Sequence, residues 1–352
     1  MYAAAVGGTL GFDFLAYRDA GMRVLAGQPL YDPTIQQTGG FGFFYYPPPF
    51  VLAILPFAWL DPTVASWIWL GLSVAMLVGG IWLLPVRASV RWATLLLAGL
   101  SWPVAYALKL GQVGPLLLLL FAIGWRWLDV PARIGAIGAI GAIVKLQPGI
   151  VLGWALLTRR WTAVLVGGLL LLAAALVATV AFGGLGIWTD FVTVLRNVSD
   201  PITTPHNFTP GAVAFQAGLA PDAAATLQVV STVLVAAAAV AAAVVLRSDA
   251  SYLVAVVASQ LLSPILWDHY AMLLLLPSAW LLERRKWWAA LIPLSTSAVV
   301  LVVGAPSAIY PIAFWAALLG VLAVGWRERR AADEPDREQA PSAPPTAVDA
   351  PA

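Results

Sequence analysis

Charge is scarce in this sequence. Only 10% of its 352 residues are Asp, Glu, Lys or Arg, whereas 61% are apolar, and the mean hydropathy is +0.87. A soluble domain has about 25% charged residues, so the composition excludes an ordinary soluble globular protein. The net charge is only +2 and the basic residues are dispersed, so we expect no nucleic-acid partner.

Cysteine is absent, and histidine occurs only twice. Disulfide bonds and thiolate chemistry are therefore excluded. The sequence also lacks an Asp-x-Asp pair and a His/Glu cluster at the spacing of metal ligands. We therefore expect neither a metal ion nor another cofactor.

Long apolar runs recur along the chain. Several approach the roughly 20 residues that cross a bilayer as a helix, and they lack the alternation typical of a membrane β-barrel. The runs cover residues 63–84, 94–107, 115–128, 161–182, 223–246 and 288–303. The sequence therefore predicts an all-α, polytopic transmembrane protein surrounded by membrane lipids.

The Lys and Arg residues give these helices an orientation. Short cytoplasmic loops collect basic residues, and most basic residues here fall between apolar runs. This pattern predicts about twelve membrane helices, the first one partial (2–12), with both ends of the chain in the cytoplasm. Helices at 134–146 and 147–158 are too short to cross alone and are expected to be tilted, buried or broken.

The end of the chain has a different composition. From Arg327 onward it is rich in Pro, Ala and charged residues. Such a composition is typical of disorder, so we expect a transmembrane domain at 1–326 and a disordered cytoplasmic tail at 327–352.

The remaining polar residues collect on the exoplasmic side in this topology. They lie near Asp13, in the stretches "LKLGQVG", "VKLQPG" and "SPILWDHY", and in the long segment 183–222. Ionisable groups at helix ends on one face favour chemistry on a lipid-linked substrate at the membrane surface. A flippase or secondary transporter, which would more often carry such groups near the midplane, remains an alternative.

Five short motifs follow one another in an order that resembles glycosyltransferase family 87. They are Asp13 with the later "GQPLYDP", "FYYPPPFVLAILPFAWL" with Tyr46, "GQVG" with Gln112, "KLQPG" with Lys145, and "SPILWDHY" with Asp268 and His269. The resemblance covers most of residues 11–285. It implies a GT-C fold whose exoplasmic loops form the active site.

The resemblance also implies an activity. Members of this family transfer a hexose, mannose in the known type, from a polyprenyl-phosphate donor to a lipid-linked or glycan acceptor, with inversion and without a metal. A bacterial plasma membrane is the expected location. Other GT-C activities, such as protein O-glycosylation or lipid A glycosylation, share the early Asp and stay open as alternatives.

Asp13 is the candidate base, because it directly follows the first helix, where the resembled family places its catalytic carboxylate. A positioned carboxylate can accept the proton of an attacking hydroxyl. Asp is also a favoured helix N-cap, so Asp13 could instead only cap a helix that begins near Phe14.

Cations are the candidates for holding the donor phosphate. Lys109 and Lys145 lie at exoplasmic helix ends, although most Lys and Arg residues lie in the cytoplasmic loops. Arg18 lies one turn beyond Asp13. The neutral amide of Gln112 is a further candidate for binding the donor phosphate. An outward lysine can also simply snorkel to lipid head groups.

His269, with Asp268 beside it, is a candidate for phosphate binding or proton relay, and otherwise a polar anchor at the interface. Tyr46, His206 and Asp268 are candidates for substrate contact, although a plain loop residue is the favoured interpretation of His206. The repeat "IGAIGAIGAI" at 134–143 predicts close helix packing through small residues. The proline run predicts a short helix at 48–60.

Overall fold

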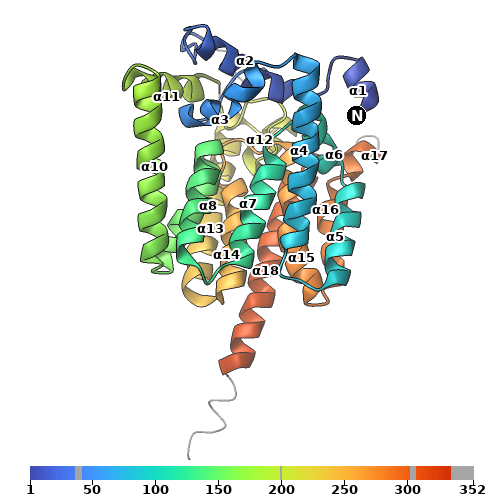
Figure 1. The fold of residues 1–352 in the computed structure, drawn as a ribbon. Coiled ribbons are helices and arrows are strands. Elements are labelled where there is room, and N and C mark those ends of the chain that lie inside the picture. The colour runs from blue at the N-terminus through green and yellow to red at the C-terminus, as the bar shows by residue number, and fades with distance from the viewer. Residues whose placement is uncertain (36–41, 199, 302–306, 334–352) are drawn as a thin grey trace, which may run out of the picture.

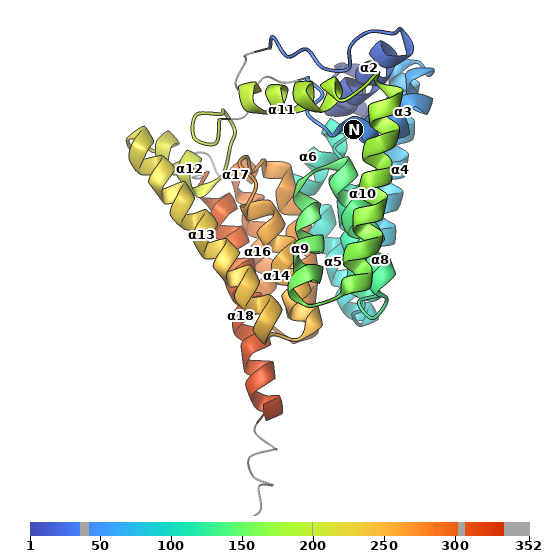
Figure 2. The same ribbon diagram turned by 90° about the vertical axis from the view of Figure 1, so that its left-hand side faces the viewer.

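The computed structural model describes residues 1–35, 42–198, 200–301 and 307–333, and the regular structure of these residues is helical. The longer helices run side by side as a bundle, and α1, α2, α3 and α11 lie at one end of it (Figures 1 and 2). In chain order the elements are α1 (Tyr2–Val6), α2 (Phe12–Leu25), α3 (Pro48–Ala58), α4 (Pro62–Leu83), α5 (Ala88–Leu100), α6 (Trp102–Leu110), α7 (Gly114–Arg126), α8 (Pro131–Val144), η1 (Gln147–Gly149), α9 (Ile150–Leu157), α10 (Trp161–Ala181), α11 (Gly186–Val198), α12 (Pro210–Gln216), α13 (Pro221–Val245), α14 (Ser248–Leu261), η2 (Asp268–Leu274), α15 (Leu275–Glu283), η3 (Trp287–Ala290), α16 (Leu291–Ser295), α17 (Ala298–Leu301) and α18 (Ile309–Asp333).

Four helices of the described residues, α4, α10, α13 and α18, are long and apolar enough to cross a membrane. Helices α5 and α6 make a fifth if this pair, bent by 66°, forms one span. The other expected spans are short, and a helix of 14 residues, such as α8 or α14, is only about 21 Å long. The helices therefore fit a membrane protein, while helix length does not show the expected count of about twelve spans.

Proline explains one of the breaks. A proline inside a continuous helix would lack an N–H and clash with the preceding turn, and α5 ends at Leu100, before Pro103. Pro103 lies instead in the first turn of α6, where a missing N–H is tolerated. The apolar run at 94–107 is therefore divided between two helices at an angle of 66°. The proline run likewise starts α3 at Pro48, as predicted.

The centre of the bundle is formed by α14 and α15. All residues at 250–261 and 275–282 are buried. In contrast, α10 and α13 expose large apolar side chains along their length, among them Leu165, Leu172 and Val233. Exposed apolar surface on these two long helices fits contact with lipid.

Ion pairs connect the helices at the end of the bundle opposite α2. Arg284 binds Asp249 at 2.8 Å and Glu328 at 2.7 Å. Because Glu328 is held in this way and Arg and Ala favour helix, α18 continues past the expected boundary at 326 to Asp333. The rest of the expected tail, 334–352, lies outside the described residues.

The glycine repeat lies in α8 at close contacts with its neighbours. A side chain at Gly135 would collide with the backbone oxygen of Ala163 in α10, and a Cβ at Gly138 would lie 2.8 Å from Leu152. Close helix packing through small residues is therefore confirmed.

We expect Gly135→Ala to lower the stability of the folded protein by about 1–3 kcal/mol, because the added methyl group forces α8 and α10 apart. Gly168→Ala is the matched control, since no atom lies within 4 Å of a Cβ there. Alanine is the better helix former by about 1 kcal/mol, so the control should be neutral or stabilising. Thermal unfolding in detergent measures both, and equal stability of the two variants would contradict this packing.

Candidate active site

One cavity of about 780 Å³ opens at the end of the bundle that carries α2 and α11. It is lined by residues that are far apart in the sequence. Eight of the nine residues that the sequence singled out lie on its wall, namely Asp13, Tyr46, Lys109, Gln112, Lys145, His206, Asp268 and His269. The ninth, Arg18, does not.

Asp13 lies in the first turn of α2, but its side chain does not cap this helix. The N-cap is Gly11, in the left-handed conformation, so the capping alternative is wrong. The carboxylate instead accepts a short hydrogen bond from the side-chain amide of Gln112. Burial raises the pKa of Asp13, and the charge of His269 and the Gln112 hydrogen bond partly offset this.

Gln112 reaches Asp13 because the turn after α6 is fastened to the start of α2. The N–H of Gly11 donates to the carbonyl of Lys109 at 2.8 Å, and the indole of Trp69 donates to the carbonyl of Gly111 at 2.7 Å. Gly111 has a φ of +70°, and a Cβ there would lie 2.6 Å from the Cβ of Phe14. Only glycine fits this close approach.

Buried tyrosines hold the other side of Gln112. The Oε1 of Gln112 lies 3.2 Å from the hydroxyl of Tyr46 and 3.4 Å from that of Tyr17, and the two hydroxyls lie 2.6 Å apart. Each hydroxyl has one proton, so one tyrosine donates to the other and the second donates to Gln112. Tyr31 donates to the carbonyl of Tyr46 at 2.5 Å. Because the oxygen of Gln112 faces these hydroxyls, its amide N–H groups face Asp13.

Lys145 follows the end of α8 and faces aromatic rings. Its Nζ lies 4.0 Å from the ring centroid of Tyr270 and 5.7 Å from that of Tyr46. No carboxylate of the described residues forms a salt bridge with it. Burial lowers the pKa of Lys145 to about 7, and the charge of Asp13 partly offsets this. Ring faces hold the amine without pairing it to an anion, so its protonated form can bind an anionic ligand.

His269 is the second residue of η2 and is buried in the cavity wall. Its Nδ1 lies 3.4 Å from the carboxylate of Asp268, which also accepts the backbone N–H of His269 at 2.8 Å. The ring is parallel to that of Trp267, with centroids 6.5 Å apart. Its Nε2 has no hydrogen-bond partner within the described part of the chain. Asp268 thus orients the ring and leaves Nε2 for a ligand.

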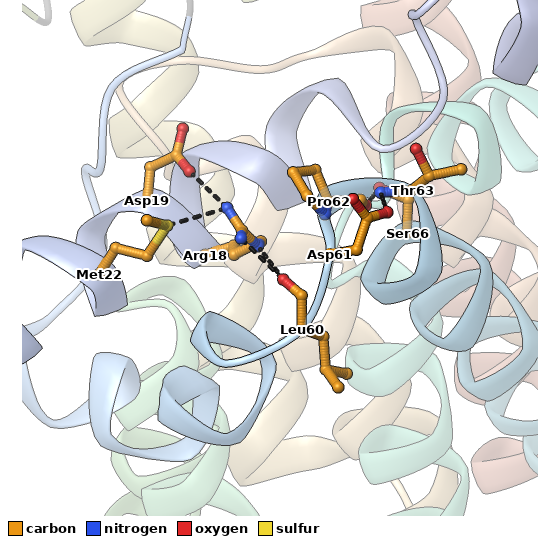
Figure 3. A network of polar contacts seen from close by, with 8 residues as sticks. All are labelled: Arg18, Asp19, Met22, Leu60, Asp61, Pro62, Thr63 and Ser66. Carbon is orange, nitrogen blue, oxygen red and sulfur yellow. Dashed lines mark hydrogen bonds and ion pairs between the residues drawn. The ribbon is translucent and has the colours of Figure 1, made fainter.

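Arg18 points away from the cavity, contrary to its expected role at the phosphate. Figure 3 shows its guanidinium donating twice to the carbonyl of Leu60, at 2.7 and 3.1 Å, and once to Asp19, at 3.2 Å. These contacts fasten α2 to the turn between α3 and α4. The Arg18 side chain is buried by them, so it acts in folding.

Arg196 is a cation of the cavity wall that the sequence reasoning did not select. It lies near the end of α11, which crosses the open end of the bundle (Figure 2). Ile187, Phe191 and Val194 form the buried face of this helix, while Arg196 is exposed. The helical period of these apolar residues is a signal that could have identified an amphipathic helix.

Lys109 and His206 complete the basic residues of the wall. Lys109 lies in the last turn of α6, with its Nζ 6.0 Å from the ring centroid of Tyr106. His206 is exposed and has a φ of +57°. The described residues hold no group of three or more His, Cys, Asp or Glu arranged for a metal ion.

Comparison with known proteins adds the family. Neither the curated proteins nor the solved structures give a significant match. The family model of glycosyltransferase family 87 matches residues 44–267, which is more than half of the chain and includes the motifs from Tyr46 to Trp267. The chain therefore belongs to glycosyltransferase family 87.

Proposed function

We propose that this glycosyltransferase moves a hexose, with mannose as the expected sugar, from a polyprenyl-phosphate donor to a hydroxyl group of a lipid-linked or glycan acceptor. The observation that supports this most is the cavity itself, where the carboxylate of Asp13 lies near two basic groups, Lys145 and His269. A sugar phosphate donor requires both kinds of group.

The reaction is a single displacement at the anomeric carbon. The carboxylate of Asp13 takes the proton of the acceptor hydroxyl as its oxygen forms the new bond to the anomeric carbon. The bond between that carbon and the phosphate oxygen breaks, and the electron pair leaves with polyprenyl phosphate. Attack opposite the leaving group inverts the anomeric configuration.

Lys145 and His269 stabilise the charge that develops on the leaving phosphate. Among the described residues Lys145 has no carboxylate in a salt bridge with it, and the Nε2 of His269 can donate to a phosphate oxygen. Lys109 and Arg196 are placed to add positive charge at the same wall. Gln112 is engaged with Asp13 and the tyrosines, so we assign it to holding the base rather than the phosphate.

The proposed setting is the plasma membrane, with a GT-C architecture of about twelve spans, the cavity at the exoplasmic face and both ends of the chain in the cytoplasm. The positions of the basic residues support this orientation. Arg284, Arg87 and Arg247 lie at or between the ends of helices opposite the cavity, where the positive-inside rule expects the cytoplasm.

We expect Asp13→Asn to reduce transfer at least about 10²-fold, because the amide keeps the size of the side chain but cannot accept the proton. Donor binding should be retained. Asp19→Asn is the matched control, because Asp19 lies on the same helix but is exposed and pairs with Arg18, and it should remain close to wild type. Initial rates of sugar transfer at saturating donor measure both variants. A near wild-type rate for Asp13→Asn would show that Asp13 is not the catalytic base.

The pH dependence of kcat/KM should be bell-shaped. Asp13 must be ionised, so the rate rises with pH through a pKa above the ordinary value of 3.8. Lys145 must be protonated, so the rate falls as pH rises through about 7. In Lys145→Arg the guanidinium stays charged, and the falling limb should move to higher pH. If the falling limb of the kcat/KM profile stays at the same pH in Lys145→Arg, Lys145 does not bind the phosphate.

The orientation can be tested by labelling, because the chain has no cysteine. We expect Asp19→Cys to react with an impermeant thiol reagent added outside intact cells, and Arg247→Cys to react only after the cells are opened. Both positions are exposed. Labelling of both positions from the outside would contradict the proposed topology.

A further inference from the structure

The side chain of Asn207 is fully buried and uses its full hydrogen-bonding capacity. Its amide nitrogen donates to the carbonyl of Pro201 at 2.9 Å and to that of Pro264 at 3.1 Å. Its Oδ1 accepts from the N–H of Leu266 at 2.9 Å and from that of Thr209 at 3.1 Å. Two donors and two acceptor sites are thus all occupied.

These bonds join two segments that are about sixty positions apart in the sequence. One is the loop 200–209 after α11, and the other is the stretch 263–267 that leads into η2. A backbone bond from Phe208 to the carbonyl of Leu266, at 2.8 Å, adds to them. Asn207 is therefore the main polar connection between the two segments.

Each segment carries part of the cavity wall next to this connection. His206 precedes Asn207 directly and has a left-handed backbone, with a φ of +57°. Trp267, Asp268 and His269 follow Leu266 directly. A non-glycine residue holds a left-handed conformation only when its surroundings impose it, so the connection constrains both parts of the wall.

The bond to Thr209 also accounts for the sequence "NFT". The Oδ1 of Asn207 closes an Asx turn on the N–H of Thr209, and the hydroxyl of Thr209 caps α12 at the N–H of Ala212. The pattern fits a glycosylation sequon, but here both side chains are buried in local structure.

We propose that Asn207 is a positioning residue that sets the place of His269 relative to the donor phosphate, by fixing the stretch 263–267 that precedes it. The inference rests on the proposed function, since it takes the reaction to be transfer from a phosphate-linked sugar. A displacement of about 1 Å at a reacting group can cost about 10²-fold in rate, so the connection acts on kcat without touching the substrate.

Asn207→Asp is the test variant. It keeps the size of the side chain and one accepting oxygen, but it removes both donors and places a carboxylate against the carbonyls of Pro201 and Pro264. Asn197→Asp is the matched control, because Asn197 lies in the other "N-x-S/T" sequence and its side chain donates to the carbonyl of Pro33 at 3.1 Å as its single bond among the described residues. We expect kcat to fall at least about tenfold in Asn207→Asp and to stay close to wild type in the control.

A double-mutant cycle with His269→Ala separates positioning from stability. If Asn207 acts through His269, then His269→Ala should lower kcat strongly in the wild-type background and only slightly in Asn207→Asp. Equal factors in the two backgrounds, or an unchanged kcat in Asn207→Asp, would overturn the proposal. An inactive wild-type protein would instead reject the proposed function, so the two failures are distinguishable.

Asn207→Ser covers the case in which Asn207→Asp does not fold. It is small and neutral and leaves a hydroxyl near the N–H of Leu266. The same cycle with His269→Ala is then measured in this background, with thermal unfolding in detergent recorded beside it. Loss of folded protein in both variants would assign Asn207 to the stability of the fold alone and overturn the proposal.

Discussion

The site depends on one backbone contact, in which the N–H of Gly11 donates to the carbonyl of Lys109. This bond holds the turn after α6 against the start of α2, and the glycine at position 111 allows the two backbones to approach. Gln112 then meets Asp13, and the hydroxyls of Tyr17 and Tyr46 fix the direction of its amide. A carboxylate in an apolar protein keeps a defined place because of these neighbours.

Lys145, on the basic side of the cavity, is held by aromatic rings, whereas Asp13 is held by a hydrogen bond. Lys145 lies against the faces of Tyr46 and Tyr270 and has no salt bridge within the described residues. A permanent carboxylate partner would occupy the amine, whereas ring faces hold it in place and leave it able to bind an anion. The arrangement suits a phosphate that arrives and leaves in each turnover.

Much of the fold and the site could be predicted from the sequence, because hydropathy and glycine spacing act locally. The long helices α4, α10 and α13 lie close to their predicted runs, and the motif residues meet in one cavity. Arg18 could not be placed, since its direction depends on the carbonyl of Leu60, which only tertiary packing brings near. Arg196 was missed because the apolar period of its helix indicates an amphipathic helix but not that this helix crosses the cavity. The number of membrane spans could not be predicted either, because short buried helices and bent helix pairs have no hydropathy pattern that distinguishes them from full spans.

The central claim is that Asp13 and the cations of one cavity transfer a sugar from a polyprenyl-phosphate donor. The most direct measurement incubates the purified protein with a polyprenyl-phosphate hexose, with and without a lipid-linked acceptor, and follows free polyprenyl phosphate. We predict release only when the acceptor is present, in equal amount to the new glycoside, which should have the inverted anomeric configuration. No release with any acceptor, or release without formation of a glycoside, would contradict the claim.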